Sequence, residues 1–336
     1  MRFVINAGIA LVVLFVAAYV YLFHTTEAPP VDPAWAIEPS TAIEPGAVTV
    51  RYTGCATLVF SDDETTVVID GWFSRPGPIQ VVSGEIGPDL DAIEKGLAYN
   101  ELTEASVVFP VHSHYDHAMD SPEVARRLGA VLLGSESTAM IGRGWGLPES
   151  QIRVVTDRER IEVGAFTLVP IESRHFQFAD PVMRERALGD PLITEPVVPP
   201  VPTFDYKVGQ AYALLVEHPR GRALIQGSAG YVEGGLEGIA ADVVFLGAGG
   251  LGSQTADYRE TYWRETVGRT GASRVIPIHW DGLMSPIEGP LRGPLRVVAL
   301  VAGGGEGTLS FLKEKEAAHP DVRIQTLPRY APVELF

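Results

Sequence analysis

The sequence predicts an α+β protein in which two β-sheets pack face to face with helices on their outer sides. Short runs of β-branched and aromatic residues, separated by turn residues, follow one another from Val48 onward. Later runs of this kind alternate with helix-like segments. The chain has 336 residues, of which 46% are hydrophobic, so it can bury a sizeable core.

The N-terminal residues form the most apolar run of the chain. Between Phe3 and Phe23 only Asn6 is clearly polar, and this length matches the ~20 residues of a membrane-crossing helix. Arg2 precedes the run and acidic residues follow it, so the positive-inside rule places the N-terminus in the cytoplasm. We expect residues 1–23 to be a single-pass signal anchor, with the rest on the periplasmic or extracellular side. A cleaved signal peptide is the alternative, although no small-x-small site follows the run.

Two proline-rich segments interrupt the regular pattern. Residues 24–46 are expected to be a tether that leads into a domain spanning residues 47–336. Residues 176–209 have no sustained period and directly follow His175. A long irregular segment inside a domain is usually functional or disordered, so we expect a lid over a site.

The remaining elements follow from hydrophobic periodicity and turn residues. Strands are expected at residues 48–52, 57–61, 65–70, 106–110, 130–134, 151–156, 160–164, 165–171, 242–247 and 274–280, and a hairpin at 211–227. Ser121, Pro122 and Gly129 carry the start and stop signals of a helix. A second helix is expected at residues 256–271.

Charge and cysteine content exclude some functions. The formal net charge of -16 disfavours binding to nucleic acid, whose backbone is also negative. Cys55 is the single cysteine, which excludes an intramolecular disulfide and a cysteine-rich zinc site. Any metal must therefore be held by histidine and carboxylate.

Three of the eight histidines lie within six positions, in "HSHYDH" at residues 112–117. In an extended loop, residues two apart point the same way, so His112 and His114 can close on one ion. Asp116 and His117 can turn to a second ion. Imidazole and carboxylate without thiolate suit zinc, and suit manganese or iron less exclusively. The alternative is a surface loop with incidental histidines.

Two more histidines occupy similar positions. His175 follows the strand-like "FTLVPI", and His279 ends "RVIPI". Loops at strand ends carry many active sites, so we expect both to join the cluster. His24, His218 and His319 have no such placement and are left out.

These segments resemble the motifs of one superfamily. "HSHYDH" resembles the signature of the metallo-β-lactamase fold superfamily, and "VVIDGWFSRPG", which contains Asp70, resembles its early aspartate-ended strand. "IESRH" and "VIPIHWDG" resemble its later metal motifs, in order, over about residues 48–285. "HYDHAMD" and "IPIHW" are most similar to the branch with N-acyl-phosphatidylethanolamine phospholipase D and ascorbate-phosphate lactonase. The resemblance implies a four-layer αβ/βα sandwich and a metal-dependent hydrolase.

One position departs from the superfamily's usual pattern. Ser228, in "ALIQGSAGY", stands where most hydrolases of this superfamily have a metal-bridging aspartate. The second metal is then weak or absent, or the site resembles the β-lactamase subclass that lacks a bridging carboxylate. We prefer the second interpretation because all six ligands are available. It assigns His112, His114 and His175 to one zinc ion, and Asp116, His117 and His279 to another.

The expected function is hydrolysis of an ester, lactone, amide or phosphodiester bond by a metal-activated water. Asp116 and His114 are expected to be required for turnover, and Tyr115, Ser228 and Trp280 are weaker candidates for substrate contact. The substrate is expected to be a small molecule or lipid-like. The alternative is a metal-binding or ligand-binding protein of this fold without turnover. A diiron oxidoreductase is disfavoured because its carboxylate ligands are missing, and a nuclease because of the acidic charge.

Overall fold

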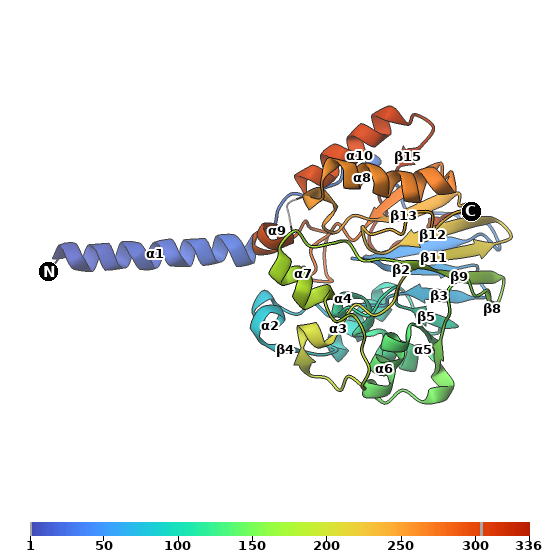
Figure 1. Ribbon diagram of the computed structural model, residues 1–336, viewed down its shortest axis with the longest axis horizontal. Helices are drawn as coiled ribbons and strands as arrows, with labels where there is room; N and C mark the ends of the chain where they lie inside the picture. The colour runs from blue at the N-terminus through green and yellow to red at the C-terminus, as the bar shows by residue number, and fades with distance from the viewer. Residues whose placement is uncertain (1, 303–304) are drawn as a thin grey trace.

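Two seven-stranded sheets form the body of the protein in the computed structural model, which describes residues 2–302 and 305–336 (Figure 1). The first sheet has the order β16-β1-β2-β3-β5-β6-β7 and the second β15-β14-β13-β12-β11-β9-β8, while β4 and β10 pair separately. The strands are β1 Thr49–Gly54, β2 Thr57–Ser61, β3 Thr66–Ile69, β4 Glu85–Ile86, β5 Val107–Phe109, β6 Val131–Gly134, β7 Ile152–Val154, β8 Ile161–Val163, β9 Phe166–Ser173, β10 Val201–Pro202, β11 Ala211–His218, β12 Gly221–Gln226, β13 Val243–Gly247, β14 Arg274–Ile278, β15 Arg323–Ile324 and β16 Val333–Glu334.

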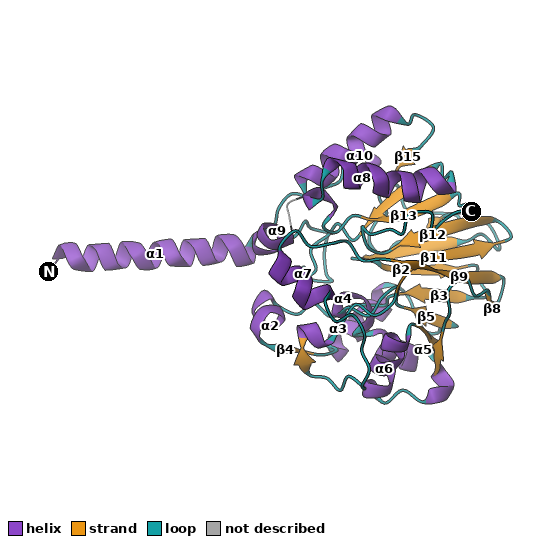
Figure 2. Cartoon of the chain, in the orientation of Figure 1, coloured by secondary structure: helices purple, strands orange, loops and turns teal. Residues whose placement is uncertain are grey.

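Helices cover the outer faces of both sheets, and one long helix projects from the body (Figure 2). They are α1 Arg2–His24, α2 Pro78–Ser83, α3 Leu90–Tyr99, α4 Tyr115–Ala118, α5 Ser121–Leu128, α6 Glu136–Trp145, α7 Pro181–Leu188, α8 Ala256–Trp263, α9 Arg296–Ala302 and α10 Glu306–Ala318. A π-helical turn at Arg264–Gly268 continues α8.

The strands alternate their side chains between the inter-sheet core and the outer layers, as a period of two requires. In β13, Val243 and Phe245 enter the core between the sheets, while Val244 and Leu246 join the cluster under α8 and α10. The outer face of the first sheet packs in the same way against α3 and α5. The predicted arrangement of two facing sheets with outer helices is therefore confirmed.

Strand direction brings the candidate residues to one edge of the sandwich. β3 and β5 are parallel, and so are β12, β13 and β14. β9 runs in the direction of β12, because both are antiparallel to β11. The loops that follow β9, β12 and β14 consequently leave the second sheet on the same side, and side chains after β5 of the first sheet meet them there.

Helix α5 is held by a buried carboxylate, and a serine at its start contacts the histidine-bearing segment. The fully buried Glu123 side chain accepts hydrogen bonds from Arg126 and Arg127, each at 2.7 Å, and from Trp145 Nε1 at 2.9 Å. Burial alone would raise the pKa of Glu123, but these donors outweigh it and lower the pKa to about 2. At the start of α5, the Ser121 hydroxyl donates to the carbonyl of His117 at 3.0 Å.

The predicted membrane anchor needs correction. Within the described part of the chain, no helix is long and apolar enough to cross a membrane. The single-pass span at residues 1–23 and the periplasmic or extracellular placement inferred from it are therefore wrong.

The two proline-rich segments have defined local structure. Within residues 24–46, Trp35 is buried in the cluster under α8 and α10, and Ala36 bridges to Thr326. Trp35 Nε1 donates to Glu316 at 2.8 Å. Residues 176–209 contain α7 and the short strand β10, which pairs with β4.

Candidate metal centre

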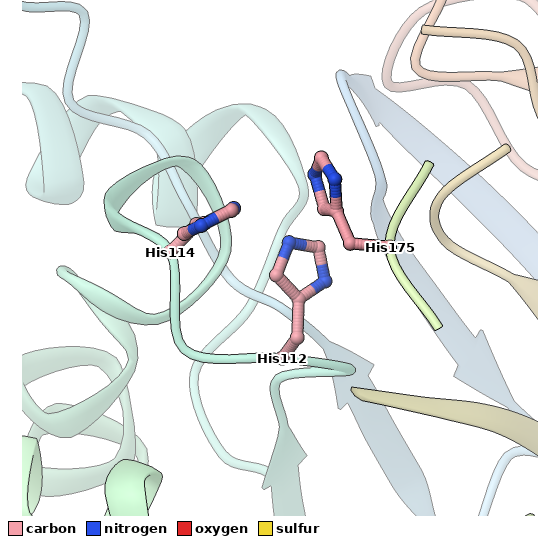
Figure 3. Close-up of side chains that lie close together, drawn as sticks. All are labelled: His112, His114 and His175. Atoms are coloured by element: carbon pink, nitrogen blue, oxygen red, sulfur yellow. The ribbon is translucent and has the colours of Figure 1, made fainter. Parts of the chain in front are cut away.

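Three histidines from two different sheets converge on one point (Figure 3). His112 and His114 come from the loop after β5, and His175 comes from the loop after β9. Each offers one ring nitrogen, and these nitrogens all lie within 4.8 Å of one another. The structure thus brings the predicted first triad together, although 61 residues separate His114 from His175 in the chain.

The second triad is tighter. Nε2 of His279, which follows β14, lies 3.1 Å from Asp116 Oδ2 and 3.2 Å from His117 Nε2. The His117 Nε2 to Asp116 Oδ2 distance is 3.7 Å. A tetrahedral zinc ion with ligands ~2.0–2.1 Å away would hold its ligand atoms about 3.3–3.4 Å apart, so these three atoms have the spacing of a zinc site.

Hydrogen bonds from the ring atoms that face away fix how each imidazole is presented. His117 Nδ1 donates to Asp70 Oδ2 at 2.7 Å, and His175 Nδ1 to the carbonyl of Phe176 at 2.8 Å. His114 Nε2 donates to the carbonyl of Ala187, in α7, at 3.3 Å. The other nitrogen of each ring remains available as a ligand, and orientation of this kind raises metal affinity.

The electrostatics of the two triads favour a cation. Burial lowers the pKa of His114 to about 4 and moves those of His112 and His175 well below their usual value. These rings are therefore neutral at pH 7, the form that binds metal. Burial opposes the charge of Asp116, but His117 and His279 outweigh it and lower the pKa of this carboxyl.

A buried atom without a partner supports the same conclusion. Nε2 of His112 is inaccessible to solvent and has no hydrogen-bond partner among the described residues. A buried polar atom left in this way is costly unless something binds it. The donor sets of both triads, the spacing of the second triad and this orphaned nitrogen of the first fit the binding of metal.

Two residues of the site, Asp70 and His279, have an unusual backbone conformation. Asp70 and His279 directly follow β3 and β14, and both have left-handed backbones, with φ of 59° and 57°. Residues with side chains adopt this region rarely, and it clusters at functional sites. Gly249 provides the space that His279 needs, since a Cβ there would lie 2.8 Å from the His279 Nδ1.

The three weaker candidates line one cavity of about 320 Å³ that also includes His114, His175 and His279. The Ser228 hydroxyl accepts from the backbone N–H of Phe176 at 3.2 Å. Trp280 Nε1 is buried without a partner in the part of the chain described. Burial first, and then Asp116, raise the pKa of Tyr115 well above its usual value, so its phenol keeps its proton.

Sequence reasoning missed two contributions to the site. Asp70 was noted as the end of a strand, but its contact with His117 joins residues far apart in the chain. Asp281 also lines the cavity, where it accepts from the Cys55 backbone N–H at 2.7 Å and from the Tyr52 hydroxyl at 2.8 Å. Its position two residues after His279 was the only sequence signal.

Comparisons with known proteins identify the fold. No family model matches the chain, and no curated protein matches it. The metallo-hydrolase Igni18 from the archaeon Ignicoccus hospitalis is 13% identical, with 86% of this chain and 100% of that chain covered and a TM-score of 0.51. CmlA, a diiron β-hydroxylase from Streptomyces venezuelae, is 14% identical, with 88% and 55% covered and a TM-score of 0.48.

A third solved structure is named for the fold itself. The metallo-β-lactamase fold protein YhfI from Bacillus subtilis is 13% identical, with 85% of this chain and 99% of that chain covered and a TM-score of 0.44. The chain shares its fold with the metallo-hydrolase Igni18, and its two facing sheets with outer helices agree with the sandwich that the resemblance implied. Its similarity to the branch with N-acyl-phosphatidylethanolamine phospholipase D stays a prediction.

Proposed function

We propose that this protein is a metal-dependent hydrolase that holds two zinc ions and cleaves an ester, lactone, amide or phosphodiester bond. One observation carries the proposal: two triads of ligand type lie side by side at the wall of a single cavity. The rings of His112 and His117, one from each triad, have centroids only 3.8 Å apart. Two adjacent sites that open on a cavity suit hydrolysis better than metal storage.

The chain's own residues have distinct roles in this proposal. The ions, when bound, supply a Lewis acid and a water acidified towards neutral pH. Asp116 stays anionic, so its carboxylate orients the attacking water and accepts a proton from it. Asp70 holds the His117 ring through Nδ1. Tyr115 and Trp280 each offer a donor hydrogen to the oxygen on which negative charge develops.

Ser228 has a positioning role in this proposal. Its hydroxyl accepts a hydrogen bond from the backbone N–H of Phe176, the residue directly after His175. The superfamily's usual aspartate at this place would add a carboxylate ligand, whereas the serine supports the segment that presents His175. The absence of a carboxylate at residue 228 is the observation behind the alternative, a metal-binding protein without turnover.

The test is hydrolysis by the zinc-loaded full chain with nitrophenyl ester, lactone, amide and phosphodiester substrates. We expect turnover of at least one class, and a loss of about a hundredfold or more in His114→Ala and Asp116→Ala, since both are proposed ligands of the ions that supply the Lewis acid and the acidified water. His24→Ala is the matched control, because His24 is exposed and belongs to neither triad. Circular dichroism checks that each variant folds.

Metal content separates the proposal from its alternative. Elemental mass spectrometry of protein purified without chelators should find about two zinc ions per chain, and about one in His279→Ala. Two ions without turnover of any substrate class would favour the non-catalytic alternative. An absence of bound metal, even after zinc is added back, would refute both.

A further inference from the structure

The cavity changes character with distance from the metal centre. Its inner end carries the polar groups of His114, Asp116, His175 and His279. Its outer walls are apolar and come from three helices and the short helical turn after β10: Val81 and Val82 in α2, Met183 in α7, Val297 and Val298 in α9, and Phe204. The part of the cavity that leads away from the candidate metal centre is therefore apolar.

Positive charge is scarce in this cavity. Arg186 is the one lysine or arginine among the described residues that line it. Its guanidinium carbon lies 4.3 Å from the centre of the Phe204 ring, so it is stacked on the wall. A polyanionic substrate group, such as a nucleotide phosphate chain, would need several cations here. The outer cavity therefore does not suit such a group.

The apolar surface continues past the cavity mouth. Helices α2, α7 and α9 gather at the end of the body from which α1 projects (Figure 1). Val82 lines the cavity and is 69% exposed, and Ile79, Val182 and Leu300 on the same three helices are also exposed. Exposed apolar side chains grouped around a pocket mark a place where an apolar ligand binds.

We propose that the substrate carries a linear apolar chain, acyl or alkyl, attached to the bond that is cleaved. This proposal rests on the proposed hydrolase function and names its substrate class. The reacting group lies at the triads, and the chain extends outward between α2, α7 and α9. A cavity of about 320 Å³ is in the range of small-molecule sites, so it can take the reacting group and the first part of such a chain.

Chain length is the variable that tests this proposal. The zinc-loaded full chain is assayed with nitrophenyl esters from acetate to dodecanoate, and with alkyl nitrophenyl phosphodiesters of the same lengths, all below micelle-forming concentrations. We expect kcat/KM to rise about two- to fourfold per methylene while each added methylene is buried, and to level off once further carbons extend into solvent. The series that shows turnover identifies whether a carboxylic ester or a phosphodiester is preferred.

A flat or falling dependence on chain length would overturn the apolar-chain proposal. Turnover of the acetate or methyl member would in that case leave the hydrolase proposal intact, so the two failures are distinguishable. Binding decides the matter when no substrate is turned over. We expect isothermal titration calorimetry to show decanoate binding at least tenfold more tightly than butanoate, and equal affinities would overturn the proposal.

Two matched valines localise the effect. Val82→Asp places a charge on the cavity wall, and we expect it to lower kcat/KM for the decanoate ester by about tenfold or more while acetate changes less than twofold. Val198→Asp is the control, since Val198 is 65% exposed but does not line the cavity. Equal effects of the two variants would contradict the proposed path of the chain.

Discussion

Replacing Asp70 with asparagine tests whether His117 is presented to a metal ion. The Asp70 Oδ2 accepts from His117 Nδ1 at 2.7 Å, and both side chains are fully buried. The Val111 N–H donates to the other Asp70 oxygen at 2.9 Å. In Asp70→Asn the amide oxygen must keep this contact, so the amide NH₂ faces His117. His117 Nδ1 must then lose its proton, and Nε2, the proposed ligand atom, gains one.

The magnitude follows from the hydrogen bond. A buried hydrogen bond to a charged group contributes ~1.5–3 kcal/mol, which is about 10- to 150-fold in an equilibrium constant. Loss of an outer partner of a ligating histidine typically costs ~10–100-fold in metal affinity. We therefore expect the Kd of the second zinc ion to rise by about 10- to 100-fold, with the first ion unaffected.

The assay is a competition titration against a zinc chelator, read as two successive binding steps. The chain offers a matched control in the Asp62–His218 pair, which is also buried, with Oδ2 and Nε2 3.4 Å apart, and lies at the opposite edge of the sheets. Asp62→Asn should leave both zinc affinities unchanged. Binding of both ions by Asp70→Asn within threefold of the unmodified protein would refute the reasoning.

Three further predictions concern stability and are measured by chemical denaturation. The pKa of Glu123 is lowered from 4.5 to about 2 in the folded state, so its contribution is present above pH 4.5 and is lost as pH falls through 2. That shift corresponds to ~3 kcal/mol. We expect Glu123→Gln to lower the free energy of unfolding by about 2 kcal/mol at pH 7, because water screens the arginine partners. A loss that does not depend on pH would contradict this origin. Gly96→Ala should destabilise by about 1–3 kcal/mol despite the better helix propensity of alanine, because the added Cβ would lie 2.1 Å from the Phe73 ring; a more stable variant would show that this contact relaxes freely. Phe245→Ala, in the inter-sheet core, should cost about 3–5 kcal/mol, and a cost below 1 kcal/mol would mean that the core collapses around the gap.

Strands were predictable because their signal is local. The run at residues 242–247 is observed as Val243–Gly247, and the two faces of its alternation lie in two different core clusters. Helices α3 and α6 were not predicted, because Gly96 and Gly142 lower the helical signal of their sequences. Packing requires the glycine at residue 96, where a Cβ would lie 2.1 Å from the Phe73 ring, and a Cβ at residue 142 would come within 3.0 Å of Leu132.

The candidate site was predictable only as far as its motifs reach. The residues of "HSHYDH" are neighbours in sequence, and His175 and His279 could be added because both follow strands. The contact of Asp70 with His117 and the contact of Ala187 with His114 depend on tertiary packing. No periodicity or composition of a single sequence encodes these distances.

Each triad takes two members from the segment after β5 of the first sheet, which comprises a loop and helix α4, and one from a loop of the second sheet. A pair of bound ions would therefore cross-link the two sheets at the edge where the candidate metal centre lies. The free energy of unfolding would then depend on the free metal concentration, by ~4 kcal/mol per site at a thousand times its Kd. A shortage of metal would therefore destabilise the contact between the two sheets as well as abolish the proposed hydrolysis.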